Sequence, residues 1–80
     1  MKEILMPKLG LTQETATILE WRKKPGNPVA RGEILLVVET DKVEQDVEAE
    51  DDGVLERILA EEGEEVPVLT PIALLRVPGE

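Results

Sequence analysis

The chain has 80 residues without cysteine or histidine, and its 18 acidic residues outnumber 9 basic ones, giving a net charge of −9. This length makes one domain, 1–80, because a typical domain takes about 100–150 residues. Without cysteine the chain has no disulfide, thiolate nucleophile or cysteine-type zinc site, and without histidine it lacks the usual neutral-pH general base. We therefore expect no catalytic residue, no metal site and no self-sufficient enzyme.

The acidic balance also argues against anionic partners. Nucleic-acid binding depends on Lys and Arg that neutralise phosphates, and an anionic membrane surface attracts the same residues. The longest uninterrupted apolar run, residues 34–38, has five residues, whereas a membrane span needs about 20. The N-terminus lacks the long apolar stretch of a signal peptide. We expect a cytoplasmic protein, or a part of one, with no nucleic acid and no membrane among its partners.

Short apolar runs separated by turn signals follow one another along the chain. In chain order, strands are expected within residues 4–6, 14–22, 34–38, 43–49, 54–59 and 72–77. Pro25-Gly26-Asn27-Pro28 is a strong turn signal. Residues 55–65 also suit a helix, but Gly53 and Gly63 leave nine residues between them, which favours a strand followed by a turn. Many short strands indicate an all-β protein, here with an aliphatic core and Trp21 as its one large anchor.

Residues 43–49 alternate between apolar and acidic side chains. Glu44, Asp46 and Glu48 share one face, and Val43, Val47 and Ala49, with Gln45 among them, share the other. Because successive side chains of a strand point to opposite faces, this pattern predicts a strand with one buried and one solvated face.

A shift of 37 residues superimposes the apolar pattern of one half of the chain on the other. The shift aligns Gly26 with Gly63, Val29 with Val66, Ile18 with Leu55, Trp21 with Ile58, Leu35 with Ile72, and residues 37–38 with 74–75. Two halves with the same apolar pattern predict a flattened barrel or sandwich of two antiparallel sheets with quasi-two-fold symmetry. Since the shift also maps Lys42 onto Gly79, we expect Lys42 at a hairpin tip opposite both termini.

Lys42 is the single basic residue of a strongly acidic segment. Residues 39–52 carry one base and eight acids, so this segment alone accounts for −7 of the net charge. Lys42 falls between the strands expected at 34–38 and 43–49, and Asp41 is a common turn residue. The two residues are therefore expected at the centre of a hairpin turn that projects the lysine into solvent.

An exposed lysine of this kind has four interpretations. The first is an ordinary solvated side chain. A Schiff-base lysine needs burial or a neighbouring cation, and here the neighbours are anions. An EF-hand calcium loop with Gly53 at its sixth position would place Leu59, not Glu, at its twelfth. The fourth interpretation is covalent attachment of a prosthetic group to the lysine.

The residues around Lys42 resemble a known motif. Residues 39–53, ETDKVEQDVEAEDDG, are similar to the lipoyl-attachment motif of dihydrolipoyl acyltransferase (E2) components of 2-oxo acid dehydrogenase complexes. Gly32 lies ten residues before Lys42 and Gly53 eleven after it, as in the family. Residues 6–12 (MPKLGLT) and Gly26-x-x-Val29-x-x-Gly32 also resemble its opening and central turn. The resemblance extends over residues 4–77, and its opening is closest to pyruvate- or acetoin-type members.

The resemblance implies a carrier domain without an active site of its own. Lipoic acid would be attached to Lys42 as a swinging arm that shuttles acyl groups and reducing equivalents. The implied partners are a lipoate ligase or lipoyl transferase, a thiamine-diphosphate-dependent decarboxylase (E1), the acyltransferase core (E2) and a flavin-dependent dihydrolipoyl dehydrogenase (E3). The residues expected to surround the attachment site as recognition elements are Glu39, Thr40, Asp41, Val43, Glu44 and Asp46, and those expected to serve turns or close packing are Gly32 and Gly53.

Two alternatives stay open at this point. Biotin carboxyl carrier domains share the fold but resemble Ala-Met-Lys-Met around their lysine, whereas here Asp41 and Val43 flank Lys42. The second alternative is an acidic β-sandwich that binds a partner without being modified. The chain departs from the lipoyl pattern at Ala16, Val43, Glu50 and residues 27–28, and none of these departures touches Asp41 or Lys42.

Overall fold

The protein is an all-β sandwich, as expected from the sequence. A computed structural model describes residues 1–10 and 12–79; Leu11, in the opening motif, and Glu80 lie outside the described residues. The strands are β1 (Lys2–Leu5), β2 (Thr15–Trp21), β3 (Pro28–Val29), β4 (Ile34–Glu39), β5 (Glu44–Glu48), β6 (Gly53–Ile58), β7 (Glu65–Pro67) and β8 (Pro71–Arg76). Residues 55–65 form a strand and a turn, and the described residues include no helix that could cross a membrane.

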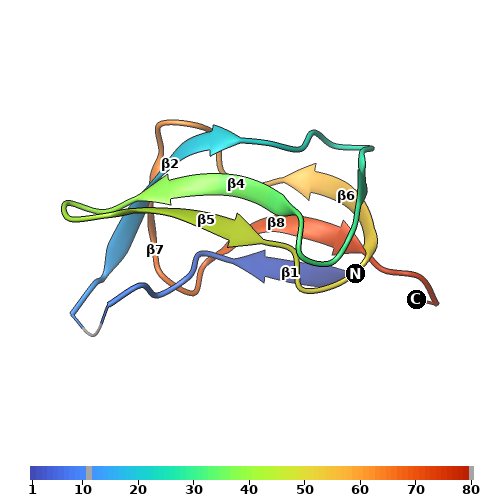
Figure 1. Cartoon of the computed structure of the whole chain (residues 1–80), viewed down its shortest axis with the longest axis horizontal. Coiled ribbons are helices and arrows are strands. Elements are labelled where there is room, and N and C mark those ends of the chain that lie inside the picture. Colours follow the sequence, from blue (N-terminus) through green and yellow to red (C-terminus); the bar gives the residue numbers. More distant parts are fainter. Residues whose placement is uncertain (11, 80) are drawn as a thin grey trace.

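The strands form two antiparallel sheets of four (Figure 1). One sheet has the order β1-β8-β6-β3 and the other β5-β4-β2-β7. Of the two forms predicted, a flattened barrel or a sandwich, the structure has the sandwich, because the sheets do not close on each other. The two short strands β3 and β7, each containing a proline, lie at sheet edges, where a missing N–H is tolerated.

The 37-residue repeat describes this architecture. It relates β2 to β6, β3 to β7 and β4 to β8, and the pairing of β2 with β4 has the same bulge as that of β6 with β8. The connecting hydrogen bonds repeat as well: the N–H of Gly63 donates to the carbonyl of Ile18, and the N–H of Gly26 to that of Leu55, both at 2.7 Å. The two sheets are therefore built from equivalent local interactions, and each half of the chain contributes strands to both of them.

The outer strands β1 and β5 are related to each other by a shift other than 37 residues. The N–H of Met6 donates to the Thr70 carbonyl at 2.9 Å, and the N–H of Ala49 donates to the Glu33 carbonyl at 2.8 Å. Met6 is thus the counterpart of Ala49, which is a shift of 43 residues. The simple 37-residue shift is wrong for β1 and β5, but the loop that carries Lys42 still lies opposite the termini.

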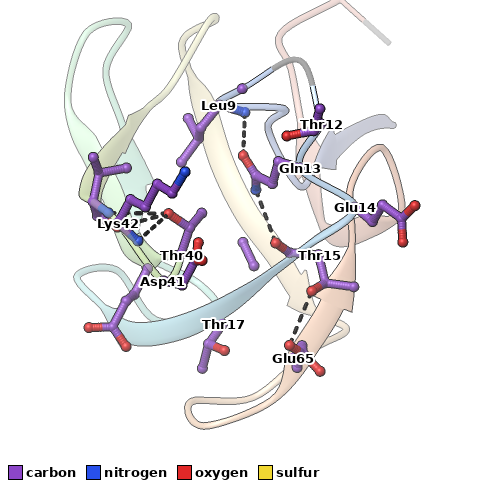
Figure 2. A pocket seen from close by; sticks show the side chains of 14 residues that line it. Leu9, Thr12, Gln13, Glu14, Thr15, Thr17, Thr40, Asp41, Lys42 and Glu65 are labelled. Atoms are coloured by element: carbon purple, nitrogen blue, oxygen red, sulfur yellow. Dashed lines mark hydrogen bonds between the residues drawn. The ribbon is translucent and has the colours of Figure 1, made fainter.

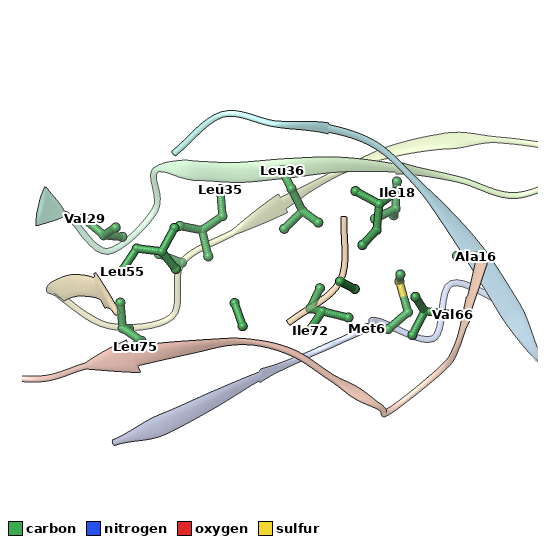
Figure 3. Close-up of a cluster of buried hydrophobic side chains, with 14 residues drawn as sticks. Met6, Ala16, Ile18, Val29, Leu35, Leu36, Leu55, Val66, Ile72 and Leu75 are labelled. Carbon is green, nitrogen blue, oxygen red and sulfur yellow. The ribbon is translucent and has the colours of Figure 1, made fainter. Parts of the chain in front are cut away.

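The core between the sheets is aliphatic (Figure 3). It contains Met6, Ala16, Ile18, Val29, Leu35, Leu36, Val38, Ala49, Leu55, Ala60, Val66, Ile72, Ala73 and Leu75. Trp21 packs against this core from the side rather than filling it, and its Nε1 donates to the Ala60 carbonyl at 2.9 Å. Val43, expected on the buried face of its strand, is 49% exposed. The β4–β5 hairpin extends past the core there, so that face has no opposite sheet to pack on.

Candidate functional site

Lys42 lies at the tip of the β4–β5 hairpin and is exposed. The tip forms one end of the molecule, whose extents are 37 × 20 × 20 Å, and both termini lie at the other end (Figure 1). The apolar run of β4 ends at Val38 and the strand itself at Glu39, and β5 begins at Glu44. The hairpin turn falls on residues 40–43, three polar residues and the exposed Val43.

Thr40 holds the turn in shape. Its backbone N–H donates to the Val43 carbonyl at 2.8 Å, and its side-chain Oγ1 accepts the backbone N–H groups of Lys42 and Val43 at 3.3 and 3.2 Å. A threonine hydroxyl that accepts N–H groups two and three residues later is a common turn device. The predicted recognition residue Thr40 is thus also the residue that organises the tip.

The Lys42 side chain extends away from Asp41. Figure 2 shows the Asp41 carboxylate and the Lys42 ammonium pointing in opposite directions, with the ammonium directed toward Leu9. Among the residues that the structure describes, no carboxylate forms an ion pair with Lys42, although four other ion pairs are present. Acylation of the Lys42 amine would therefore break no ion pair among the described residues.

A groove of about 690 Å³ lies beside the tip. It runs between the hairpin and residues 9–10 and 12–17, and Lys42 and Val43 belong to one wall. Gln13 orders the other wall, because its Oε1 accepts the Leu9 N–H at 2.7 Å and its Nε2 donates to the Thr15 carbonyl at 3.2 Å (Figure 2). Sequence reasoning did not connect this wall with Lys42; the similarity of residues 6–12 to the family's opening was the only signal.

The predicted recognition acids lie along the hairpin. Glu39 and Glu44 are directly opposite each other across β4 and β5, and Asp46 is opposite Val37. Like charges in directly opposed positions destabilise a strand pair, so this arrangement is not explained by hairpin stability. It gives the outer face of the hairpin a concentrated negative charge a few residues from Lys42.

The two predicted structural glycines act in different ways. Gly32 has a φ of +89° in the turn before β4, a conformation that L side chains rarely adopt. Beside it, Glu33 accepts the Lys23 ammonium at 2.8 Å and the Ala30 N–H at 2.6 Å. The Lys23 hydrogen bond first, and the Ala30 N–H second, hold the pKa of Glu33 below its usual value.

Gly53 is a strand residue rather than a turn residue. It is the first residue of β6, and a Cβ at this position would lie 2.3 Å from the backbone oxygen of Arg76. Gly53 therefore permits the close approach of β6 and β8. Within residues 1–10 and 12–79, no group of three acids could hold a metal ion.

Comparisons with known proteins match most of the chain to one protein family. The family model Biotin_lipoyl, described as "Biotin-requiring enzyme", matches residues 2–75. The solution structure of the lipoyl domain of the 2-oxoglutarate dehydrogenase complex from Azotobacter vinelandii is 36% identical, with a TM-score of 0.80, and the match covers 96% of this chain and 98% of that domain.

Curated relatives match over a small part of their own length. A pyruvate dehydrogenase E1 component subunit beta from Rhizobium meliloti is 44% identical over 98% of this chain and 17% of the relative. The mitochondrial dihydrolipoyllysine-residue acetyltransferase of the pyruvate dehydrogenase complex from Neurospora crassa is 44% identical over 90% of this chain and 16% of the relative. The dihydrolipoyllysine-residue succinyltransferase component of the 2-oxoglutarate dehydrogenase complex from Escherichia coli is 46% identical over 76% of this chain and 15% of the relative. The chain thus spans less than a fifth of these relatives.

Proposed function

The chain belongs to the biotinyl/lipoyl attachment family, as a domain of the lipoyl type, and on that premise we propose that Lys42 is its site of modification and carries lipoate. The observation that carries the proposal is the exposed lysine at the hairpin tip, whose ammonium no described carboxylate engages. An amide bond between Lys42 Nζ and the carboxyl carbon of lipoate forms with net loss of water. The tip fits this group because an acyl chain on Nζ meets open solvent and the groove, not packed protein.

Two observations favour lipoate over biotin. The relatives named above include a dihydrolipoyllysine-residue acetyltransferase and a solved lipoyl domain. In this chain Asp41 and Val43 flank the lysine, where biotin carrier domains resemble Ala-Met-Lys-Met. Biotin is therefore the alternative that the experiment below must separate.

When bound, the lipoyl group supplies a dithiolane that accepts acyl groups and electrons. The protein's residues have a supporting role. Thr40 fixes the turn, Lys42 Nζ anchors the arm, and the 37 Å body keeps the anchor far from the termini. Conversion of the ammonium to an amide removes one positive charge, so the net charge of −9 becomes −10.

The acids of the hairpin are proposed to direct recognition. Glu39, Asp41, Glu44 and Asp46 present negative charge around the anchor, and electrostatic complementarity mainly raises association rates and specificity. The partners proposed on this basis are a lipoate ligase or lipoyl transferase, and the E1, E2 and E3 components of a pyruvate- or acetoin-type complex. Tethering would convert encounters between the arm and these enzymes into intramolecular events at high effective concentration. A cytoplasmic location stays a prediction.

Intact-mass analysis tests the proposal. The protein is co-expressed with a lipoate ligase and lipoate, or with a biotin ligase and biotin. We expect one lipoyl adduct on the wild type, none on Lys42→Arg, and full modification of the control Lys24→Arg, which changes an exposed lysine at the other end of the molecule. An adduct that persists in Lys42→Arg would place the modification elsewhere, and a biotinyl adduct alone would favour the carboxylase carrier.

A further inference from the structure

The sandwich is open between its two outer strands β1 and β5, away from Lys42. These strands are the edges of different sheets, and a groove of about 420 Å³ lies between them. The buried side chains Met6, Leu35 and Leu75 contribute to its lining. Leu5 and Leu69 also line it but are 41% and 62% exposed. The groove is therefore apolar at its base and at Leu5 and Leu69 on its rim. Charged residues form the rest of the rim, where Lys2 of β1 pairs with Asp51 after β5.

Leu69 has an unusual backbone conformation. Its φ is +66°, and it is the one residue other than glycine with a positive φ in the described part of the chain. The 37-residue repeat aligns it with Gly32, whose φ is +89°. A left-handed conformation is unfavourable for an L residue with a Cβ. Because the Leu69 side chain is largely exposed, its packing does little to offset this cost. Strained residues of this kind are found at functional positions.

The rim of the groove is acidic on the β5 side. Glu48 and Glu50 line it and are exposed, and the neighbouring Val47 packs toward the core. β5 pairs with β4 on one side, and within residues 1–10 and 12–79 no strand pairs with its other side. Its free backbone groups can therefore pair with an added strand. Side chains of such a strand would alternate between the acidic face and the apolar groove.

We propose that the opening between β1 and β5 is a docking site for an extended segment of a partner protein in which basic and aliphatic residues alternate. The segment adds to β5, places its aliphatic side chains against Leu5, Val47 and Leu69, and places its basic side chains beside Glu48 and Glu50. Charge complementarity selects this occupant over a second copy of the chain, because two copies would each carry −9. The site involves no residue of the Lys42 tip and goes beyond the carrier function.

Amide-resolved NMR titration with a synthetic peptide tests the proposal. The probe is an acetylated, amidated peptide Gly-Lys-Leu-Lys-Leu-Lys-Gly, and the control peptide Gly-Lys-Lys-Lys-Leu-Leu-Gly has the same composition without alternation. We expect shift changes at residues 4–6 and 47–49 and at Leu69, and binding about tenfold weaker for the control peptide. Leu69→Gly, which removes the side chain and suits the backbone, is expected to weaken binding by about tenfold.

Matched variants separate the groove from general effects. Leu59→Ser removes another exposed leucine, 45% exposed, and is expected to bind as the wild type does. Glu48→Gln is expected to weaken binding, whereas Glu61→Gln, remote from the groove, is not. Shift changes confined to residues 39–46, equal binding of both peptides, or full binding by Leu69→Gly would each overturn the proposal. Shift changes that follow protein concentration without peptide would assign the groove to a second copy, which also overturns it.

Discussion

The contact between Gly53 and β8 gives the sharpest prediction about stability. In Gly53→Ala, the new Cβ would lie 2.3 Å from the Arg76 backbone oxygen, and real Cβ contacts are essentially never under 3.0 Å. The two atoms must therefore separate by at least the difference, 0.7 Å (3.0 − 2.3). β6 is held on its other side by the pairing of Val29 with Gly53. Relief thus requires movement of paired backbone rather than rotation of a side chain.

The expected loss is large for a domain of this size. Overpacking costs typically about 1–3 kcal/mol and occasionally more, and we expect about 3 kcal/mol because both atoms are anchored in strands. An 80-residue domain has roughly 4–12 kcal/mol of stability in total. Since each kcal/mol shifts the Tm of such a domain by about 4–8 °C, the Tm should fall by about 12–24 °C.

Thermal and urea unfolding, followed by circular dichroism and Trp21 fluorescence, measure the effect. Gly10→Ala is the control for Ala itself, because a Cβ there meets nothing within 4 Å. Gly32→Ala is the control for backbone conformation, with open space but a φ of +89°, and should lose about 1–2 kcal/mol. A Tm for Gly53→Ala within about 4 °C of the wild type, a change of less than about 1 kcal/mol, would refute the reasoning.

Three further predictions concern single side chains. Leu69→Gly should raise the free energy of urea unfolding by about 0.5–1 kcal/mol, because relief of the left-handed strain exceeds the entropy that glycine adds to the unfolded chain; a loss of stability would show that the side chain packs internally. The folded-state pKa of Glu33 is depressed. The stability that ionised Glu33 contributes is therefore present above its unfolded pKa of about 4.3 and is lost as pH falls through its folded pKa. Urea midpoints should therefore fall less below about pH 4 in Glu33→Gln than in the wild type, and identical profiles would contradict this. Thr40→Val should speed hydrogen exchange of the Lys42 and Val43 amides by about 2–10-fold, through loss of about 0.5–1.5 kcal/mol of hydrogen bonding, while Thr40→Ser should not; equal exchange in all three proteins would contradict the assigned role.

Much of the fold could be predicted because the sequence repeats its own apolar pattern. The alignment of Ile18 with Leu55 and of Gly26 with Gly63 corresponds to matched strands and matched hydrogen bonds. Strands β3 and β7 were missed because they have two and three residues and each contains a proline. A pattern of alternation needs about four residues to be visible.

The remaining differences depend on tertiary structure. Alternation assigns Val43 to the inner face of its strand, but it does not say where the opposite sheet ends. Gly53 reads as a turn residue until the position of Arg76 is known. The left-handed conformation of Leu69 contradicts its residue type, and only its alignment with Gly32 could have indicated it. The exposed position of Lys42 was predictable from local sequence, because a turn between two strands needs no distant contact.

The opposed positions of Lys42 and the termini have a consequence for reach. Along its 37 Å axis the folded body spans as far as about eleven fully extended residues, which cover about 3.3–3.6 Å each. Eleven flexible residues would have a root-mean-square span of only about 17–20 Å. A sandwich held at its terminal end therefore acts as a stiff spacer that sets a minimum distance between the tether and the lysine. A flexible chain of the same contour length would spend most of its time folded back toward its attachment point.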